Sequence, residues 1–346
     1  DICCIFNYPT HYRKNIYKRM ENELHCDFYF GDLHKKRLKM IDFSIFSHSP
    51  VICPTKKIGQ FNWNSGSLKL SFKHYKFYVL TGEQSCLSTW VILLLNKILN
   101  KKTFLWAHCW RGNEKGIKAF HTKMYLRLAS GLLLYGNYAK KLLIAEGFKE
   151  DKLHVIYNSL DYDTQLKIRK KLTLNNVYQK YFGNDYPVVI FTGRLTTEKK
   201  IGQLIEAHKV LLDQGCYFNV LLLGDGEDTN RLKELVVQHK TESYFWFYGP
   251  CYNEAIIGNF YYNATVCVSP GNVGLTAIHA MTYGCPVIAH DTFDKQGPEF
   301  EAIVPGVTGD FFEKDNVFLL ADKIKKWISM GNKEQIKASC FKIIDS

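Results

Sequence analysis

Short apolar runs alternate with longer amphipathic segments along the whole chain. In the amino-terminal half the apolar runs predict strands at Ile2–Phe6, Phe77–Thr81, Thr103–Ala107, Leu132–Tyr135 and His154–Tyr157. Helical spacing of apolar residues predicts helices near Tyr12–Leu24, Ser85–Leu99, Ile117–Ala129 and Tyr138–Glu146. The stretch from Asp32 to Leu70 shows neither pattern, and we expect it to contain loops. Alternating strands and helices are typical of parallel sheets built from βαβ units.

The carboxyl-terminal half repeats this alternation. The pattern predicts strands at Val188–Thr192, Val220–Leu223, Phe245–Tyr248, Thr265–Val268 and Pro286–Ala289, and helices at Ile201–Leu212, Asn230–Gln238, Asn253–Tyr262 and Leu275–Tyr283. A polar segment, Asp161–Asp185, separates the halves. The sequence therefore predicts an α/β protein of two Rossmann-like doubly wound domains, residues 1–165 and 166–346, facing a central cleft.

Composition excludes several classes of protein. The 346 residues are 46% hydrophobic and 23% charged, which is typical of a globular protein. The densest apolar stretch, Trp90–Leu95, is far shorter than the roughly 20 residues needed to cross a bilayer, and no secretory signal opens the chain. We expect a fragment trimmed at both ends. The 11 cysteines are odd in number and form no C-x-x-C pair, so we expect free thiols, as in a reducing cytosol.

The net charge of +12 is concentrated in one half of the chain. Residues 1–165 hold 25 Lys and Arg against 13 Asp and Glu, whereas residues 166–346 hold 20 of each. Such asymmetry favours contact of the first half with an anionic surface. Nucleic acid is disfavoured because no recognised binding module accompanies the charge.

One predicted helix combines apolar and basic residues in a way that suits an anionic membrane. Apolar residues recur at helical spacing and cations lie among them: Ile117, Phe120, Met124 and Leu128, with Lys115, Lys118, Lys123 and Arg127. This pattern is consistent with docking on anionic lipid. It is equally consistent with a core helix whose long cations extend to solvent.

The strongest candidate for chemistry is the segment Phe191–Lys200, where an apolar strand ends in Gly193 and two cations precede a helix. The guanidinium of Arg194 can bind two phosphate oxygens, and Lys199 supplies a compact charge on a flexible stem. Both could neutralise a diphosphate leaving group as its charge develops. The alternative is a solvated loop with ordinary surface cations.

A second candidate is the strand–turn–helix segment Val268–Met281. Its turn comprises Gly271, Asn272, Val273, Gly274, Leu275 and Thr276. Several backbone N–H groups point outward where a helix begins, which favours anion binding. The alternative is an ordinary tight turn of a doubly wound fold.

These segments resemble a known family at several ordered positions. From Val188 to about Phe312 the chain is similar to the donor domain of glycosyltransferase family 4, also called glycosyl transferases group 1, which has the GT-B fold. The matching motifs are G-R-L-x-x-x-K at Gly193–Lys199, the strand ending in Gly224-Asp225-Gly226, the turn Tyr248-Gly249-Pro250, the run Ala280–Ile288, and Glu301 with Gly306 and Gly309. The first half resembles the family more loosely, through Thr103–His108 and Val155–Asp161. The resemblance implies that Gly193 and Gly249 line the nucleotide-sugar site.

The departures from the family pattern concern its paired glutamates. Members usually carry E-x7-E, with one Glu near the donor sugar and one near the ribose, whereas this chain has Gly271 and His279. We expect the backbone N–H of Gly271 to take the first role. His279 could hydrogen-bond a ribose hydroxyl, or it could be a structural histidine of the helix.

The resemblance also places His108 beside the anomeric carbon and the acceptor hydroxyl. A retaining front-face reaction needs no protein nucleophile, since the departing phosphate can take the acceptor proton. His108 would then orient or polarise the acceptor; alternatively it satisfies its own turn. Asp161-Tyr162-Asp163 imitates a metal-binding D-x-D but lies at the domain boundary, so we expect no metal and no other cofactor.

The sequence thus predicts a transferase that moves a hexose-type sugar from a nucleoside diphosphate to a hydroxyl of a saccharide or lipid-linked saccharide. We expect retention of configuration, a role in cell-surface polysaccharide synthesis, and a cytoplasmic place that includes the inner face of the membrane. The alternatives are a nucleotide-sugar epimerase of the same fold and a degenerate sugar-nucleotide-binding module.

Overall fold

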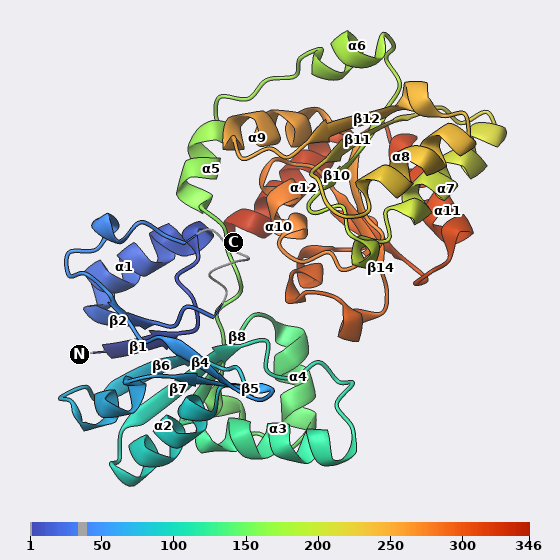
Figure 1. Cartoon of the computed structure of the whole chain (residues 1–346). Helices are drawn as coiled ribbons and strands as arrows, with labels where there is room; N and C mark the ends of the chain where they lie inside the picture. Colours follow the sequence, from blue (N-terminus) through green and yellow to red (C-terminus); the bar gives the residue numbers. More distant parts are fainter. Residues whose placement is uncertain (1, 34–39) are drawn as a thin grey trace. The chain divides into compact units, whose positions relative to one another are not determined.

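The computed structural model describes residues 2–33 and 40–346 (Figure 1). The chain forms two compact units, residues 1–161 and 162–346. The change from one unit to the next therefore falls at Asp161, slightly before the boundary expected at residue 165. Among the residues described, no helix is long and apolar enough to span a bilayer.

The first unit is built on a parallel sheet of seven strands in the order β3-β2-β1-β6-β7-β8-β9. Their bounds are β1 Ile2–Phe6, β2 Cys26–Phe30, β3 Val51–Ile52, β6 Phe77–Thr81, β7 Lys102–Ala107, β8 Gly131–Leu134 and β9 Leu153–Val155. The five strands predicted in this half are confirmed. Strands β2 and β3 were not predicted from the sequence.

Helices cover this sheet, and a hairpin lies within the stretch expected to be loops. The helices are α1 Lys14–Leu24, α2 Leu87–Ile98, α3 Gly116–Leu128 and α4 Asn137–Ala145, close to their predicted bounds. The hairpin pairs β4 Thr55–Ile58 with β5 Phe61–Asn64. Short 3-10 turns, Phe43–Ile45 and Ser67–Phe72, lie in the same stretch, of which residues 34–39 are outside the described part of the chain.

The second unit contains a parallel sheet of six strands in the order β12-β11-β10-β13-β14-β15. Their bounds are β10 Val188–Thr192, β11 Asn219–Leu223, β12 Phe245–Gly249, β13 Val266–Ser269, β14 Val287–His290 and β15 Gly309–Phe312. The order reverses between β10 and β13, so this is a doubly wound sheet with its switch point there. The predicted α/β class with two doubly wound domains is confirmed, although β15 was missed.

The helices of the second unit lie on both faces of its sheet (Figure 1). They are α5 Tyr162–Arg169, α6 Val177–Phe182, α7 Gly202–Asp213, α8 Thr229–Gln238, α9 Glu254–Asn263, α10 Thr276–Thr282, α11 Val317–Ile328 and α12 Lys333–Asp345. Helices α5, α6 and α11 were not predicted from the sequence. In α11 the signal was present, since Leu320, Ile324 and Trp327 recur at helical spacing and are all buried.

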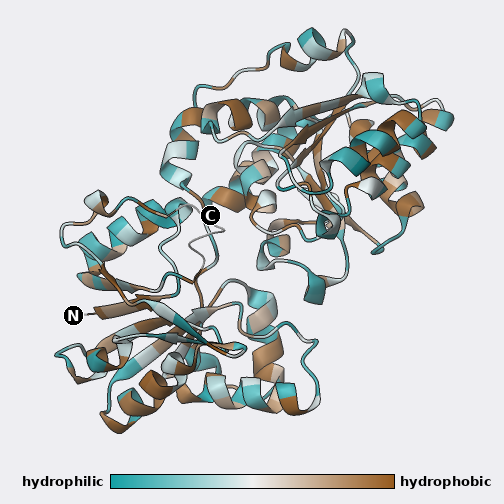
Figure 2. Cartoon of the chain, in the orientation of Figure 1, coloured by the Kyte–Doolittle hydropathy of each residue, from teal (hydrophilic) through white to brown (hydrophobic). Residues whose placement is uncertain are grey.

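Burial explains why the strands of the second sheet read as continuous apolar runs. Helices on both faces leave the central strands β10, β11 and β13 almost wholly buried, and Figure 2 shows this sheet largely in the hydrophobic colour. All eleven cysteines have free thiols, and Cys3, Cys4, Cys267 and Cys285 lie in strands or the core as expected. The rigid core therefore positions the loops that follow β10 and β13.

Candidate functional site

The switch point of the second sheet brings the two candidate segments together. Thr192–Lys199 follows β10 and Ser269–Thr276 follows β13, and these strands are neighbours in the sheet. Ligands of doubly wound sheets bind outside the carboxyl ends of the strands at such a point. Topology alone thus identifies this edge as the candidate site.

A close approach between two backbones fixes the loop that carries Arg194. The N–H of Gly193 donates to the carbonyl oxygen of Leu223 at 3.0 Å. A Cβ on Gly224 would lie 1.8 Å from the carbonyl oxygen of Gly193, so only glycine fits there. On the other side of Arg194, the side chain of Leu195 is 1% exposed and anchors the loop in the core. The loop is therefore held at both ends.

Arg194 itself projects from this loop into solvent. Throughout residues 2–33 and 40–346, its guanidinium has no hydrogen-bond or ion-pair partner. All five of its N–H donors are consequently available to an anion. The alternative interpretation, an ordinary cation on a solvated loop, is weakened because the loop that carries Arg194 is held rigidly.

Lys199 points from the first segment to the second. Its Nζ donates to the main-chain oxygen of Asn272 at 2.5 Å. Burial lowers the pKa of Lys199, and the positive charge of Arg194 lowers it further. Two cations are thus held close enough to repel each other, which an anion bound between them would relieve.

Gly271 is packed directly against the loop of Lys199. Its N–H donates to the carbonyl oxygen of Lys199 at 3.0 Å, so the donor expected to contact the sugar already has a partner. A Cβ on Gly271 would lie 2.3 Å from the carbonyl oxygen of Glu198. The two loops therefore pack too closely at position 271 for any side chain, including the glutamate that the family usually has there.

The rest of the turn is fixed by hydrogen bonds to the segment after β14. The Oε1 of Gln296 accepts from the N–H of Val273 at 2.8 Å, and the Nδ2 of Asn272 donates to the carbonyl oxygen of Lys295 at 3.1 Å. Gly274 has a φ of 48°, a conformation that favours glycine, and Leu275 immediately precedes α10. Gln296 was not predicted as a site residue, because a contact between separate loops leaves no local pattern in the sequence.

Thr276 closes the turn back onto the first segment. Its Oγ1 donates to the carbonyl oxygen of Thr192, the last residue of β10, at 3.4 Å. On the outer side, Gly249 ends β12 with a φ of 89° and forms a bridge with Gly224. The predicted nucleotide-site residues of the second unit, Gly193, Gly249 and Gly271–Thr276, thus lie along one edge of its sheet.

A buried carboxylate that the sequence analysis did not select stands beside this turn. Glu299 is 8% exposed, and its negative charge raises the pKa of Lys199 against the effect of burial. Its Oε2 and the Cα of Gly274 both lie within 2.7 Å of the point that a Cβ on Gly297 would occupy. Glu299 therefore brings negative charge to the part of the turn at Gly274 and acts on Lys199.

His279 is joined to a second carboxylate that was also missed. Its Nε2 lies 2.8 Å from the Oε1 of Glu254, the first residue of α9. The same oxygen accepts from the hydroxyl of Tyr283 at 2.8 Å and from the Nε2 of Gln165 at 2.9 Å. Burial raises the pKa of Glu254, but these hydrogen bonds and the charge of His279 outweigh it, so the pKa is lowered. His279 is thus part of a polar cluster.

In the first unit, His108 follows β7 and lies beside aromatic and cationic side chains. Its ring centroid is 4.8 Å from that of Tyr135, whose hydroxyl accepts from Arg13 at 2.6 Å. Desolvation lowers the pKa of His108 to about 4, and the charges of Arg111 and Arg13 act in the same direction. Solvent reaches part of the ring, which limits the shift, but the imidazole is neutral at pH 7.

The basic helix predicted from the sequence is α3, and its apolar face is turned outward. Ile117 is 78% and Phe120 65% exposed, with Met124 also exposed, whereas Tyr125 and Leu126 face the core. The core-helix interpretation is therefore wrong for these three residues. Lys123, which was grouped with the lipid-facing cations, pairs with Glu146 at 2.7 Å.

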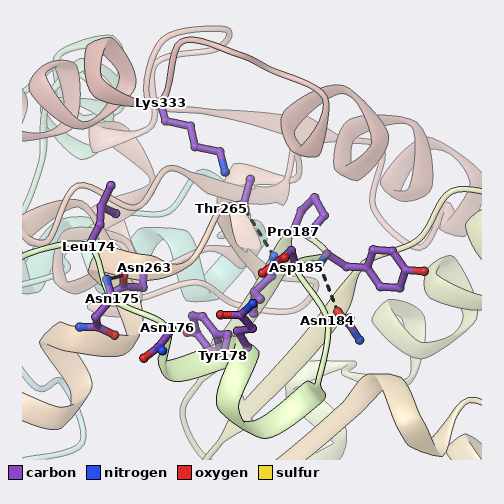
Figure 3. Close-up of a pocket in the computed structure, with 13 residues that line it drawn as sticks. Leu174, Asn175, Asn176, Tyr178, Asn184, Asp185, Pro187, Asn263, Thr265 and Lys333 are labelled. Atoms are coloured by element: carbon purple, nitrogen blue, oxygen red, sulfur yellow. Dashed lines mark hydrogen bonds between the residues drawn. The ribbon is translucent and has the colours of Figure 1, made fainter.

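A polar cavity of about 420 Å³ lies at the opposite edge of the second sheet (Figure 3). Val188 and Thr265, at the start of β10 and just before β13, line it together with Asn175, Asn184 and Lys333. Because it opens at the amino ends of the strands, it is separate from Arg194 and Lys199. Across the described ranges, no three His, Cys, Asp or Glu side chains are grouped as metal ligands would be.

Known proteins resemble this chain in sequence and in fold. Residues 177–338 match the sequence profile of the family "Glycosyl transferases group 1". Over 200 residues the chain is 28% identical to the capsular polysaccharide biosynthesis glycosyltransferase CapM of Staphylococcus aureus, covering 55% of this chain and 49% of CapM. The chain thus spans about half the length of this curated relative.

Solved structures resemble the chain over nearly its whole length. The apo form of the lipopolysaccharide outer core galactosyltransferase WaaB has a TM-score of 0.69 at 16% identity, covering 99% of this chain and 98% of WaaB. HepE of Anabaena, in complex with UDP, has a TM-score of 0.70 at 18% identity, covering 100% of this chain and 94% of HepE. The chain has the GT-B fold, and residues 177–338, within its second unit, match the glycosyl transferases group 1.

Proposed function

We propose that this protein transfers a sugar from a nucleoside diphosphate to a hydroxyl group. The observation that carries the proposal is the pair of cations at the switch point: an unpartnered Arg194 guanidinium on a rigid loop, and a Lys199 ammonium fixed to Asn272. A diphosphate is the dianionic group that such a pair suits. UDP is the first nucleotide to test, because the structural relative HepE is in complex with UDP.

The proposed chemistry depends on where charge develops. As the bond to the anomeric carbon breaks, negative charge grows on the departing diphosphate, and Arg194 and Lys199 stabilise it most strongly at that moment. These cations would replace a metal ion. We propose retention of configuration, with the leaving phosphate accepting the acceptor proton. A neutral His108 then orients the acceptor hydroxyl by a hydrogen bond instead of acting as an obligatory base.

We further propose that His279 and Glu254 contact the donor as one unit. The Oε1 of Glu254 is occupied by three donors, which fixes the imidazole of His279 at the edge of α10. Glu299 would supply the carboxylate missing at Gly271. Both assignments explain how the site can function without the family's paired glutamates.

The acceptor we propose is a saccharide or lipid-linked saccharide of a surface polysaccharide, the process that the name of CapM describes. The exposed apolar face of α3, with Lys115 and Lys118 beside it, supports attachment to the inner face of a membrane. Flotation with anionic vesicles tests this. Unchanged binding after Lys115→Glu and Lys118→Glu would count against a role of α3.

The deciding experiment for activity is a thermal-shift screen of UDP-, GDP- and ADP-sugars, followed by turnover with the best donor. A ligand that binds only the folded protein raises its apparent stability. Arg194→Ala should abolish release of free nucleoside diphosphate and leave the unfolding transition unchanged, whereas Arg194→Lys should keep partial binding. Wild-type turnover in Arg194→Ala would refute the assigned role.

The products separate the rival functions. A transferase releases free nucleoside diphosphate together with a glycosylated acceptor. An epimerase returns a changed nucleotide sugar, and a binding module returns the donor unaltered. Chromatography of the nucleotide products distinguishes all three outcomes in a single assay.

A further inference from the structure

A cavity of about 260 Å³ opens at the amino-terminal edge of the first unit's sheet, away from His108. Its lining contains five cations and no carboxylate: Lys97, Lys101, Lys102, Arg127 and Lys152, with Leu93, Asn100, Thr103, Leu128, Ala129 and Ser130. These residues come from the ends of α2 and α3 and from the starts of β7, β8 and β9. The cavity is therefore built by several separate segments of the chain.

Most of these charges are not neutralised by the protein. Within the described chain, the ammonium groups of Lys97, Lys102 and Lys152 have no hydrogen-bond or ion-pair partner. Lys101 donates to the carbonyl oxygen of Lys73 at 2.5 Å, and Arg127 donates to that of Glu146 at 3.4 Å. Neither contact provides a full negative charge. Like charges around one concave surface repel each other and attract an anion from solution.

Exposed apolar side chains surround the same edge. Ile98 is 80% and Phe72 69% exposed, and Leu94, Leu99 and Phe77 are also exposed. Ile98 and Leu99 lie between Lys97 and Lys101 in the chain, and Phe77 pairs with Lys102 in the register of β6 and β7. Apolar side chains next to a row of cations fit the boundary between acyl chains and anionic headgroups.

We propose that this cavity binds the phosphate of an anionic phospholipid headgroup and that the surrounding apolar residues enter the membrane boundary. The cations of the cavity would suit any phosphate. The exposed apolar side chains around it have no partner in a free phosphate, so the two features together favour a lipid. The cavity lies at the end of β7 opposite His108, about 20 Å away for a six-residue strand. The inference does not depend on glycosyl transfer.

Helix dipoles provide the competing explanation for two of the cations. Lys97 and Arg127 lie in the last turns of α2 and α3, where positive charge offsets the negative helix end. Lys102 begins β7, and Lys152 ends the three-residue 3-10 turn Glu150–Lys152 just before β9, so neither lies at the end of an α-helix. A purely structural role therefore predicts lower stability when the cations are removed and no effect on lipid binding.

The test is co-flotation with phosphatidylcholine vesicles that do or do not contain phosphatidic acid, in the absence of any nucleotide sugar. The cavity variant carries Lys97→Gln, Lys102→Gln and Lys152→Gln, which are exposed positions. A matched control removes three exposed cations from the second unit, through Lys170→Gln, Lys180→Gln and Lys342→Gln. At about 1 kcal/mol per basic residue, the cavity variant should bind on the order of 100-fold more weakly.

Two further measurements identify the ligand and the contribution of the apolar residues. Vesicles whose charge comes from a fatty acid carboxylate should bind more weakly than vesicles with equal charge from phosphatidic acid. Ile98→Ser combined with Phe77→Ser should weaken binding without changing its dependence on salt. Urea unfolding of each variant shows that the fold is retained.

Three results would overturn the proposal. Wild-type protein could fail to float with phosphatidic acid vesicles while glycerol 3-phosphate raises its melting temperature, which would make this a site for a soluble phosphate. The cavity variant and the second-unit control could lose binding equally, which would indicate non-specific attraction. Finally, the cavity variant could lose stability and keep full binding, as the helix-dipole explanation predicts.

Discussion

The ammonium group of Lys199 lies 2.5 Å from the main-chain oxygen of Asn272, and this hydrogen bond ties the loop after β10 to the turn after β13. A second hydrogen bond joins the same two loops, because the N–H of Gly271 donates to the carbonyl oxygen of Lys199. The two segments that were predicted separately from the sequence as candidate phosphate-binding segments are therefore joined into one rigid unit. A ligand phosphate at this edge would meet a preformed site, which reduces the entropy lost on binding.

Removal of the Lys199 charge should impair transfer more than it impairs folding. Lys199→Met keeps the apolar stem and loses both the charge and the bond to Asn272. If the ammonium stabilises the departing diphosphate, kcat/KM should fall on the order of 100-fold or more. Steady-state kinetics with the donor found in the screen measures this.

Lys200→Met is the matched control for Lys199→Met. Lys200 pairs with Asp315 on the surface, and the loss of such a pair costs at most about 1 kcal/mol. Donor kinetics should therefore stay close to those of the wild type. Equal losses in both variants would show that the loop needs positive charge in general and not the ammonium of Lys199.

A side chain at position 271 should destabilise the second unit. In Gly271→Ala the new Cβ would lie 2.3 Å from the carbonyl oxygen of Glu198, so the two loops must move apart. Overpacking of this kind costs about 1–3 kcal/mol, which denaturant unfolding measures. Gly331→Ala is the control, because no atom lies within 4 Å of its Cβ position. A stable Gly271→Ala variant would argue against the packed arrangement of the two loops.

The cluster around Glu254 should make stability depend on pH in the acidic range. Its pKa is lowered from the ordinary value of 4.5, so the unfolded chain binds the proton more tightly than the native protein does. The stabilisation is fully present above 4.5 and is lost as the pH falls through the lower native pKa. The glutamine side chain of the variant Glu254→Gln does not titrate. The free energy of unfolding of the wild type should therefore exceed that of the variant by less below pH 4.5 than at neutral pH.

Urea unfolding at pH 7 and below pH 4 measures the free energy of unfolding of the wild type and of Glu254→Gln. The difference between the two proteins should be smaller below pH 4 than at pH 7. His279→Phe provides a second comparison, since it removes the first hydrogen bond that lowers the pKa. In that variant the pH dependence due to Glu254 should weaken. Identical pH dependence in all three proteins would contradict the described cluster.

His208 should contribute a second pH dependence of the same sign, in a higher pH range. It is 1% exposed, its Nε2 lies 3.0 Å from the carbonyl oxygen of Phe218, and burial lowers its pKa from 6.5 to about 4. Between these values the unfolded chain binds a proton that the native protein does not. Wild-type stability should therefore fall by up to about 3 kcal/mol as the pH decreases through that window.

The variant His208→Gln isolates this effect, because it can donate to the Phe218 carbonyl oxygen and does not titrate. At pH 7 it should be less stable than the wild type, since a buried ring is replaced. The difference in the free energy of unfolding between the wild type and His208→Gln should become smaller as the pH approaches 4. Parallel stability curves for the two proteins would mean that folding leaves the pKa of His208 unchanged, which would contradict its burial in a neutral form.

Part of the site was predictable because its signals are local. The position of Arg194 follows from a strand that ends in glycine, and the turn Gly271–Thr276 follows from the next strand–helix connection. Parallel topology then requires both loops to lie at the carboxyl edge of one sheet. The contributions of Glu254, Gln296 and Glu299 were not predictable, because each depends on contacts between separate segments of the chain.

The sequence by itself determined the α/β class, most of the strands, the pair of cations proposed to bind phosphate and the unequal charge of the two halves. Hydrophobic periodicity and short motifs are local properties, which is why they could be read directly. Only the tertiary structure showed that the N–H of Gly271 is already bonded, that α3 turns Phe120 outward, and that five cations converge on one cavity. Those facts depend on which distant backbone or side chain packs against each residue, and no local pattern encodes that.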